Sequence, residues 1–243
     1  SVNFIGMGAG KTIVCYYNYN HYPAFTVSGY MTLSNLTIDR ANVQNNAQLN
    51  ATNVVFSNCY GSKPDSYGNN YGGAIYCLSG NTQVNINNCS FHDNYAEYGG
   101  AIYMGSGNLN IINSMFINNY AYNFGGSIAC QGASNILISK SKSYNSYSVA
   151  DAGGVIYIKS SSSLTINDVE IANASATFGG AIVSLYTDVA LSYLKICNST
   201  ANWDGGAIYH MYGGFSSTYG NFYNNSAKNG GALYIDNSTK LCC

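Results

Sequence analysis

A Gly-Gly pair followed by a short apolar run recurs along this 243-residue chain and constrains its fold more than any other feature. The pairs are Gly72–Gly73, Gly99–Gly100, Gly125–Gly126, Gly153–Gly154, Gly179–Gly180, Gly205–Gly206 and Gly230–Gly231. The steps between them are 27, 26, 28, 26, 26 and 25 residues. A nearly constant period of this size is typical of stacked repeat architectures, in which each repeat contacts only its neighbours.

A second row of residues repeats in step with the Gly pairs. Its members are Phe56, Phe91, Phe116, Ser143, Ile171, Ile196 and Phe222. Two residues after each member stand Asn58, Asp93, Asn118, Asn145, Asn173, Asn198 and Asn224. Apolar or small residues also recur seven, five and two positions before each member, as Val84, Ile86 and Cys89 do before Phe91. This spacing predicts two short strands joined by a tight turn, and the segment after the Gly pair adds a third strand.

Three short strands in about 26 residues cannot form an independent domain, but they can form one coil of a parallel β-helix. Equivalent side chains of successive coils would then stack about 4.8 Å apart. Glycine permits a positive φ and a close backbone approach at one corner. Asn tolerates the left-handed region at another corner, where its amide can bond to its equivalent in the next coil. A β-sandwich is the alternative fold, and the fixed period disfavours it.

The repeat also predicts which residues point inward and where it is interrupted. The residue three positions after the first Gly of each pair, such as Ile182, is expected in the core. Residues 1–30 are expected to form a leading coil or an N-terminal cap, and residues 31–243 the β-helix repeats. Residues 60–70 lengthen one coil and contain Pro64, which predicts a loop insertion. The out-of-register Gly pair in residues 210–215 predicts another loop.

The pairing of "GGAI" with "FxxN" resembles the repeat of chlamydial polymorphic outer membrane proteins. It is also similar to repeats of adhesin-like proteins of methanogenic archaea and of some protist surface proteins. "GGAI" occurs at 72–75, 99–102, 179–182 and 205–208, and "FxxN" at 91–94, 116–119 and 222–225. The resemblance covers about residues 30–240. It implies an all-β fold, a right-handed single-stranded parallel β-helix of the pectin-lyase-like type, displayed at a cell surface with roles in adhesion or self-assembly.

Composition excludes several classes of function. Charged residues make up 8% of the chain, the formal net charge is −1, and Arg40 is the one arginine. Nucleic-acid binding requires dense neutralisation of phosphates, so no nucleic-acid partner is expected. No run of about 18 apolar residues occurs, so no membrane-spanning helix is expected. The first residues lack the pattern of a signal peptide, and we expect a mature or excised piece. Low charge and eight cysteines favour an extracellular, oxidising location.

Reactive side chains are sparse, which argues against catalysis. Hydrolysis of a glycan requires paired carboxylates, and cleavage of acidic sugars requires clustered carboxylates, often with Ca²⁺. Here Asp93, Glu97, Asp151 and Asp204 occur roughly once per coil before the Gly pairs, which favours solvated turn residues. No His or Cys set has zinc-ligand spacing. We therefore predict no catalytic residue, no cofactor and no metal site. A polysaccharide lyase or hydrolase, or a carbohydrate-binding β-helix, is the alternative.

The predicted contact surface is aromatic. Four positions after the first Gly of a pair stand Tyr76, Tyr103, Tyr157, Tyr209 and Tyr234, with Ala129 and Val183 interrupting the row. Alternation from the inward isoleucines places these side chains outward. An exposed tyrosine stripe could stack on sugar rings or pack against a protein, although it could also be a solvated face. The predicted function is a cell-surface or extracellular structural, adhesin-like β-helix that contacts proteins or glycans and can self-associate.

Two further groups of residues carry predictions. Seven sequons begin at Asn35, Asn50, Asn88, Asn173, Asn198, Asn224 and Asn237. We predict glycosylation at Asn50 or Asn237 in preference to Asn173, Asn198 and Asn224, which are expected to be buried at the corner. Cys77 and Cys130 share one inward position two coils apart, at roughly 9–10 Å, which is too far for a disulfide. They are predicted to be buried free thiols.

Overall fold

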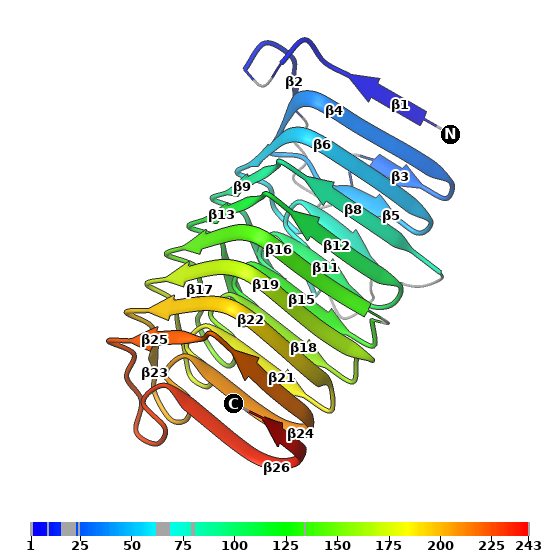
Figure 1. Cartoon of the computed structure of the whole chain (residues 1–243). Coiled ribbons are helices and arrows are strands. Elements are labelled where there is room, and N and C mark those ends of the chain that lie inside the picture. The colour runs from blue at the N-terminus through cyan, green and yellow to red at the C-terminus, as the bar shows by residue number, and fades with distance from the viewer. Residues whose placement is uncertain are drawn as a thin grey trace.

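The computed structural model is a parallel β-helix whose coils stack in chain order from the N-terminal to the C-terminal end (Figure 1). It describes residues 2–8, 10–15, 23, 25–61, 69–78, 81–133 and 135–242. All strand pairs among the described residues are parallel. Each strand pairs with its equivalents in neighbouring coils, as Ile156 pairs with Ile128 and Ile182. The predicted all-β parallel β-helix with about 26 residues per coil is therefore confirmed. Its right-handedness stays a prediction.

The strands are short and follow one another around each coil. The first are β1 (Val2–Ile5), β2 (Ile13–Cys15), β3 (Phe25–Val27), β4 (Tyr30–Asp39), β5 (Val43–Asn45) and β6 (Gln48–Ser57). The next are β7 (Ile75–Cys77), β8 (Gln83–Asn87), β9 (Ser90–His92), β10 (Tyr95–Tyr98), β11 (Ile102–Met104), β12 (Asn108–Ile112), β13 (Met115–Ile117) and β14 (Tyr120–Phe124).

The remaining strands continue the same order. They are β15 (Ile128–Gln131), β16 (Asn135–Tyr144), β17 (Tyr147–Ser148), β18 (Ile156–Lys159), β19 (Ser163–Ala172), β20 (Ser175–Ala176), β21 (Ile182–Leu185), β22 (Asp188–Cys197), β23 (Thr200–Ala201), β24 (Ile208–Thr218), β25 (Asn221–Tyr223) and β26 (Leu233–Cys242). The described part of the chain contains no helix that could cross a membrane.

Each regular coil contains one segment more than the sequence predicts. Between the Asn corner and the Gly pair lies a strand of two to five residues, and these strands form a separate parallel sheet, β10-β14-β17-β20-β23. The bent strand pair and the strand after the Gly pair belong to the other sheet. The extra strands are too short to carry a recognisable alternation of apolar and polar residues.

The core is a set of stacked ladders that run the length of the coils. Six isoleucines three positions after the first Gly are at most 2% exposed: Ile75, Ile102, Ile128, Ile156, Ile182 and Ile208. Leu233, the last member, is half-buried. The rings of Phe56, Phe91 and Phe116 stack at 4.7 and 4.8 Å between centroids, nearly parallel. The predicted inward positions and stacking distance are confirmed.

The two positions of a Gly pair require glycine for different physical reasons. The first takes a positive φ of 47–68°, which side chains rarely adopt. The second faces the next coil so closely that a Cβ on Gly180 would collide with the carbonyl oxygen of Gly206. A pair is required because one glycine turns the chain and the other admits the neighbouring coil.

The Asn corner also has the predicted backbone conformation. The seven Asn and Asp residues of this row have φ values of 52–58°. Three positions before the row of Phe56 and its equivalents, the tight turn inside the bent strand pair has φ values of 47–56°. Asn and Asp visit this left-handed region at low cost, so they can occupy corners that do not require glycine.

Three parts of the chain were expected to depart from the regular coil. Strands β1 and β2 both pair with β4, and β3 pairs with β5, so the described strands before residue 30 stack on the first regular coil. In the predicted insertion at 60–70, residues 62–68 lie outside the described residues. The predicted loop at 210–215 is wrong, because these residues lie within β24. Tyr212, with φ 55°, occupies the same corner as Tyr186, with φ 53°.

Candidate functional site

The five tyrosines predicted to form an exposed stripe lie outside the core, but three of them are buried. Tyr76, Tyr103 and Tyr157 are 1%, 6% and 4% exposed, and Tyr209 and Tyr234 are half-buried. The first three pack in two hydrophobic clusters that are separate from the main core. Their outward direction is as predicted, and their predicted exposure is wrong. A contact role for this row stays a prediction.

A neighbouring row of rings covers these tyrosines. It consists of the aromatic residues directly before Gly pairs: Tyr71, Tyr98, Phe124 and Phe178. The Tyr71 ring lies 4.7 Å from that of Tyr103, and the Phe124 ring lies 4.4 Å from that of Tyr157. Burial raises the pKa of both Tyr76 and Tyr157 to about 12. The row is thus a second apolar cluster on the outside of the coil.

A different row of tyrosines is exposed to solvent and unbroken over four coils. Tyr60, Tyr95, Tyr120 and Tyr147 lie side by side at the start of the extra strand segment. Their ring centroids are 4.7, 4.4 and 5.3 Å apart in that order. Tyr60 and Tyr147 are 44% and 40% exposed, and the two middle rings are half-buried between neighbours. We call these four residues the tyrosine ladder.

The surroundings of the tyrosine ladder are weakly polar. Tyr122 and Val149, two residues along the strand from Tyr120 and Tyr147, are each 52% exposed. Beyond Tyr147 the same row continues with the hydroxyl residues Ser175, Thr200 and Ser226. Stacked phenol rings present apolar edges and hydroxyl groups at a nearly constant spacing, which suits contact with an extended partner.

The sequence contains a signal for the tyrosine ladder that the predicted coil does not include. Each of its members stands four residues after a member of the Phe56, Phe91, Phe116 and Ser143 row. The position is therefore fixed in the repeat frame. It was missed because the short strand that carries it was not recognised.

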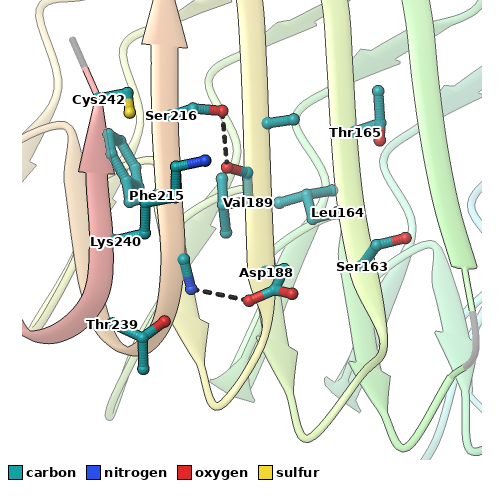
Figure 2. Close-up of a pocket in the computed structure, with 12 residues that line it drawn as sticks. Ser163, Leu164, Thr165, Asp188, Val189, Phe215, Ser216, Thr239, Lys240 and Cys242 are labelled. Atoms are coloured by element: carbon teal, nitrogen blue, oxygen red, sulfur yellow. Dashed lines mark hydrogen bonds between the residues drawn. The ribbon is translucent and has the colours of Figure 1, made fainter.

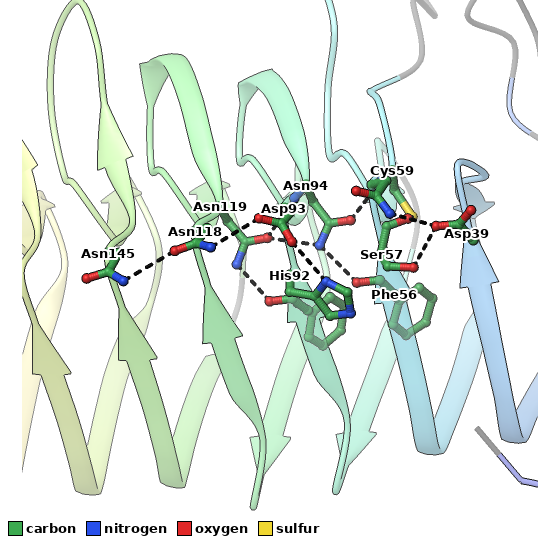
Figure 3. A network of polar contacts seen from close by, with 12 residues as sticks. Asp39, Phe56, Ser57, Cys59, His92, Asp93, Asn94, Asn118, Asn119 and Asn145 are labelled. Carbon is green, nitrogen blue, oxygen red and sulfur yellow. Dashed lines mark hydrogen bonds and ion pairs between the residues drawn. The ribbon is translucent and has the colours of Figure 1, made fainter. Parts of the chain in front are cut away.

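The Asn corner forms a continuous polar network between coils (Figure 3). The Asn145 side-chain amide donates to Asn118 Oδ1 at 3.3 Å, and the Asn118 amide donates to Asp93 Oδ1 at 3.1 Å. His92 lies 3.1 Å from the other oxygen of Asp93. These bonds confirm the predicted ladder of side chains and hold one edge of the coils together.

The Asn of the "FxxN" motif has its own structural role. Asn119 Nδ2 donates to the Phe91 carbonyl of the preceding coil at 2.9 Å, and its Oδ1 accepts from the backbone N–H of Asn94 at 3.1 Å. Asn94 makes the equivalent bonds to Phe56 and Cys59. Both side chains are fully buried. The motif is therefore explained by satisfaction of backbone groups between coils.

The predicted burial of three sequon asparagines is wrong. Asn173, Asn198 and Asn224 are exposed, because the Asn corner projects outward from the coil. Asn237 is also exposed, whereas Asn50 is half-buried and its Oδ1 accepts from the Asn85 amide at 2.8 Å. Glycosylation at Asn50 or Asn237 stays a prediction.

Four long strands near the C-terminal end carry a hollow of about 390 Å³ (Figure 2). It lies across β19, β22, β24 and β26, and Asp188 is the single carboxylate among its lining residues. Asp188 Oδ1 accepts the backbone N–H of Gly214 at 2.7 Å, and Ser216 donates to the Val189 carbonyl at 3.3 Å. The polar groups here mainly join neighbouring coils.

The carboxylates considered for catalysis are bonded to separate neighbours. Asp93 accepts from Asn118, Glu97 accepts from the backbone N–H of Asn70 at 3.0 Å, and Asp204 accepts from Asn229 at 2.7 Å. Among the described residues, no three His, Cys, Asp or Glu side chains form a group that could hold a metal ion. These contacts do not define a reaction.

The thiols behave as predicted. Cys77 and Cys130 are free and fully buried, with Met104 between them in the same row. Burial raises the pKa of Cys77 to about 12, which keeps it a neutral thiol. They fill the core as small apolar residues.

Comparison with known proteins gives one short match. Residues 220–236 match the family model described as the Chlamydia polymorphic membrane protein (Chlamydia_PMP) repeat. No curated protein and no solved structure matches the chain. The matched segment contains one complete copy of the spacing seen in every coil, from Phe222 and Asn225 to the pair Gly230–Gly231.

The solenoid and this match define the class of protein. The chain is a parallel β-helix repeat protein, and one of its repeats is similar to the polymorphic membrane protein repeat. The same Gly pair, Asn corner and inward isoleucine recur in the coils outside the matched residues.

Proposed function

We propose that this protein is displayed at a cell surface or outside the cell and acts by contact with a protein or glycan. Its rigid β-helix presents the tyrosine ladder as the contact surface. Outer-membrane or cell-surface proteins are suggested by the matched repeat. The observation that carries the proposal is the unbroken stack of Tyr60, Tyr95, Tyr120 and Tyr147 on the solvent side of the coil.

The physical basis of the contact is preorganisation. Each ring is held by its neighbours in adjacent coils, so binding orders few side chains and costs little conformational entropy. The row is straight because it follows the strand spacing of about 4.8 Å. A second copy of the same β-helix, aligned side by side, is one partner that this spacing supports.

The test is the double substitution Tyr95→Ser with Tyr120→Ser. Adhesion to cells, binding to immobilised glycans and self-association in analytical ultracentrifugation are compared with the unaltered chain. We expect at least one of these to weaken about tenfold, because two stacked rings are lost from the middle of the surface. Circular dichroism checks that the β-helix is intact.

The matched control is Tyr30→Ser, which removes a tyrosine that is 60% exposed and lies outside the ladder. It should leave all three measurements unchanged. If the double variant keeps its fold and all three interactions, the tyrosine ladder is a solvated face and the proposal is wrong.

A further inference from the structure

The outer face of β11, β15, β18, β21 and β24 follows a packing rule that fails at two places. A ring directly before a Gly pair normally contacts the tyrosine that follows the next Gly pair. Such contacts join Tyr71 to Tyr103 at 4.7 Å, Phe124 to Tyr157 at 4.4 Å and Phe178 to Tyr209 at 5.6 Å. These aromatic pairs make the second apolar cluster outside the core.

At Tyr98 and Ala129 the tyrosine alone is missing, whereas at Ala152 and Val183 both rings are missing. Ala152 pairs with both Phe124 and Phe178 and occupies the position that a ring occupies in those coils. Val183 likewise pairs with Tyr157 on one side and Tyr209 on the other. Two smaller residues therefore stand where the coils on both sides have an aromatic pair. Val183 lies on β21, between β18 and β24 (Figure 1).

The missing rings leave a groove of about 480 Å³. Ala152, Val183 and Tyr157 lie beneath it and are almost fully buried, so the rings of the two flanking aromatic pairs that an occupant can touch are the half-buried Phe124, Phe178 and Tyr209. Tyr157 and Tyr209 lie two coils apart, which is about 9–10 Å. Val183 lies between these two rings in the same row, so an occupant lies over Val183, against the half-buried rings of Phe178 and Tyr209.

The rim of the groove extends the aromatic surface. Tyr186 and Tyr212 stack at 4.6 Å with an angle of 7° between the rings, and they are 55% and 38% exposed. Both have a left-handed backbone, which residues other than Gly, Asn and Asp rarely adopt. The equivalent position one coil earlier is Ser160, so tyrosine is not needed to make this corner.

The polar groups of the groove define the chemistry of the occupant. Asp151 and Lys159 both line it, one acceptor and one donor of opposite charge. The lining therefore carries no net charge, and aromatic faces outnumber the polar groups. A pyranose matches this combination, since its C–H face stacks on aromatic rings and its hydroxyl groups bond to a carboxylate and an ammonium group.

We propose that this groove binds one pyranose residue of a neutral polysaccharide, held against the half-buried rings of Phe178 and Tyr209 and covered by Tyr186 and Tyr212. The lack of net charge disfavours an acidic sugar. The groove lies on a different row from the tyrosine ladder, so a negative result for one of the two binding proposals does not decide the other.

The experiment measures binding of neutral gluco-, manno- and galacto-configured tetrasaccharides at millimolar concentration by ligand-detected NMR. An oligogalacturonate and a tyrosine-rich peptide are the competing probes. We expect one neutral tetrasaccharide to bind the unaltered chain. Val183→Tyr together with Ala152→Phe fills the groove with the missing aromatic pair, and it should abolish that binding while the melting temperature stays the same or rises.

A second variant keeps the test decisive if the filled groove does not fold. Tyr186→Ser removes one exposed rim ring and should weaken binding about tenfold. Tyr219→Ser removes a ring that is 75% exposed at another corner, and it should have no effect. The proposal is overturned if no neutral tetrasaccharide binds, if an acidic oligosaccharide or the peptide binds better, or if binding survives in both groove variants.

Discussion

Two rows of tyrosines on the outside of this β-helix differ in how far water reaches them. Tyr76 and Tyr103 point away from the core, and yet they are almost completely buried. Tyr95 and Tyr120 stand on the neighbouring short strands and form part of a surface whose end members are 40–44% exposed. Both rows repeat once per coil and both follow the same strand spacing.

The difference lies in what stands beside each row. The rings of Tyr71, Tyr98 and Phe124 reach over the buried row from before the Gly pair. No equivalent second row of rings covers the tyrosine ladder in the described residues. The strand that carries a tyrosine therefore decides whether its side chain points outward. The neighbouring segment decides whether that side chain is exposed to solvent.

The largest loss of stability is expected from a substitution in the core that supports both rows of tyrosines. Ile182 is 1% exposed and pairs with Ile156 and Ile208. Ile182→Asp places an unpaired charge in the stacked core and should cost about 5 kcal/mol or enough to prevent folding. Urea denaturation followed by circular dichroism measures this, with Ile182→Val as the control at about 1 kcal/mol. An unchanged cooperative transition for Ile182→Asp would contradict the inward register.

A smaller effect separates the two rows directly. Tyr103→Ser should lower the free energy of unfolding by about 3–4 kcal/mol, because it empties a buried ring site beside Tyr71. Tyr120→Ser should lower it by about 1 kcal/mol or less, because that ring is half-buried at the surface. Tyr103→Phe removes only the hydroxyl group, which donates to Gln131 at 3.3 Å. Equal losses of stability for the two serine variants would show that the rows do not differ in packing.

The smallest effect appears at high pH. Burial raises the pKa of Tyr76 to about 12, above its ordinary value of about 10. The folded state thus keeps its proton while the unfolded state loses it, so the stabilisation is complete below pH 10 and is lost as the pH rises from 10 to 12. Tyr76→Phe should reduce the slope of stability against pH in this range by about 1.4 kcal/mol per pH unit.

The measurement is urea denaturation between pH 8 and pH 11.5, with phenolate formation followed by ultraviolet absorbance. Tyr30→Phe, at an exposed position on β4, serves as the control and should leave the slope unchanged. A slope that Tyr76→Phe does not alter would mean that the buried phenol titrates no differently in the folded and unfolded chains.

The sequence predicted the coil well because the repeat imposes the same local requirement many times. A positive φ at Gly179 and a crowded position at Gly180 recur in other pairs, and each occurrence strengthens the inference. The corner at Asn145 was predictable for the same reason. The out-of-register glycines at 213 and 214 were misread, since a single occurrence cannot distinguish a loop from a corner inside a strand.

The candidate surfaces were harder to predict. Exposure of Asn173 and burial of Tyr157 both contradicted expectation, because each depends on residues from other segments of the coil. The groove at Ala152 and Val183 is visible only when three coils are stacked in register. Residues 26 to 52 positions apart then become neighbours, which no local pattern specifies.

By itself, the sequence determined the period of the β-helix, the inward ladder of isoleucines and the backbone conformation of two corners. These follow from the spacing of apolar residues and from the steric limits of glycine and asparagine, which are local properties. Only the tertiary structure decided which outward side chains meet water and where a groove opens. The exposure of these side chains depends on the segment between the Asn corner and the Gly pair. The path of that segment around the coil decides which outward side chains are covered by neighbouring rings.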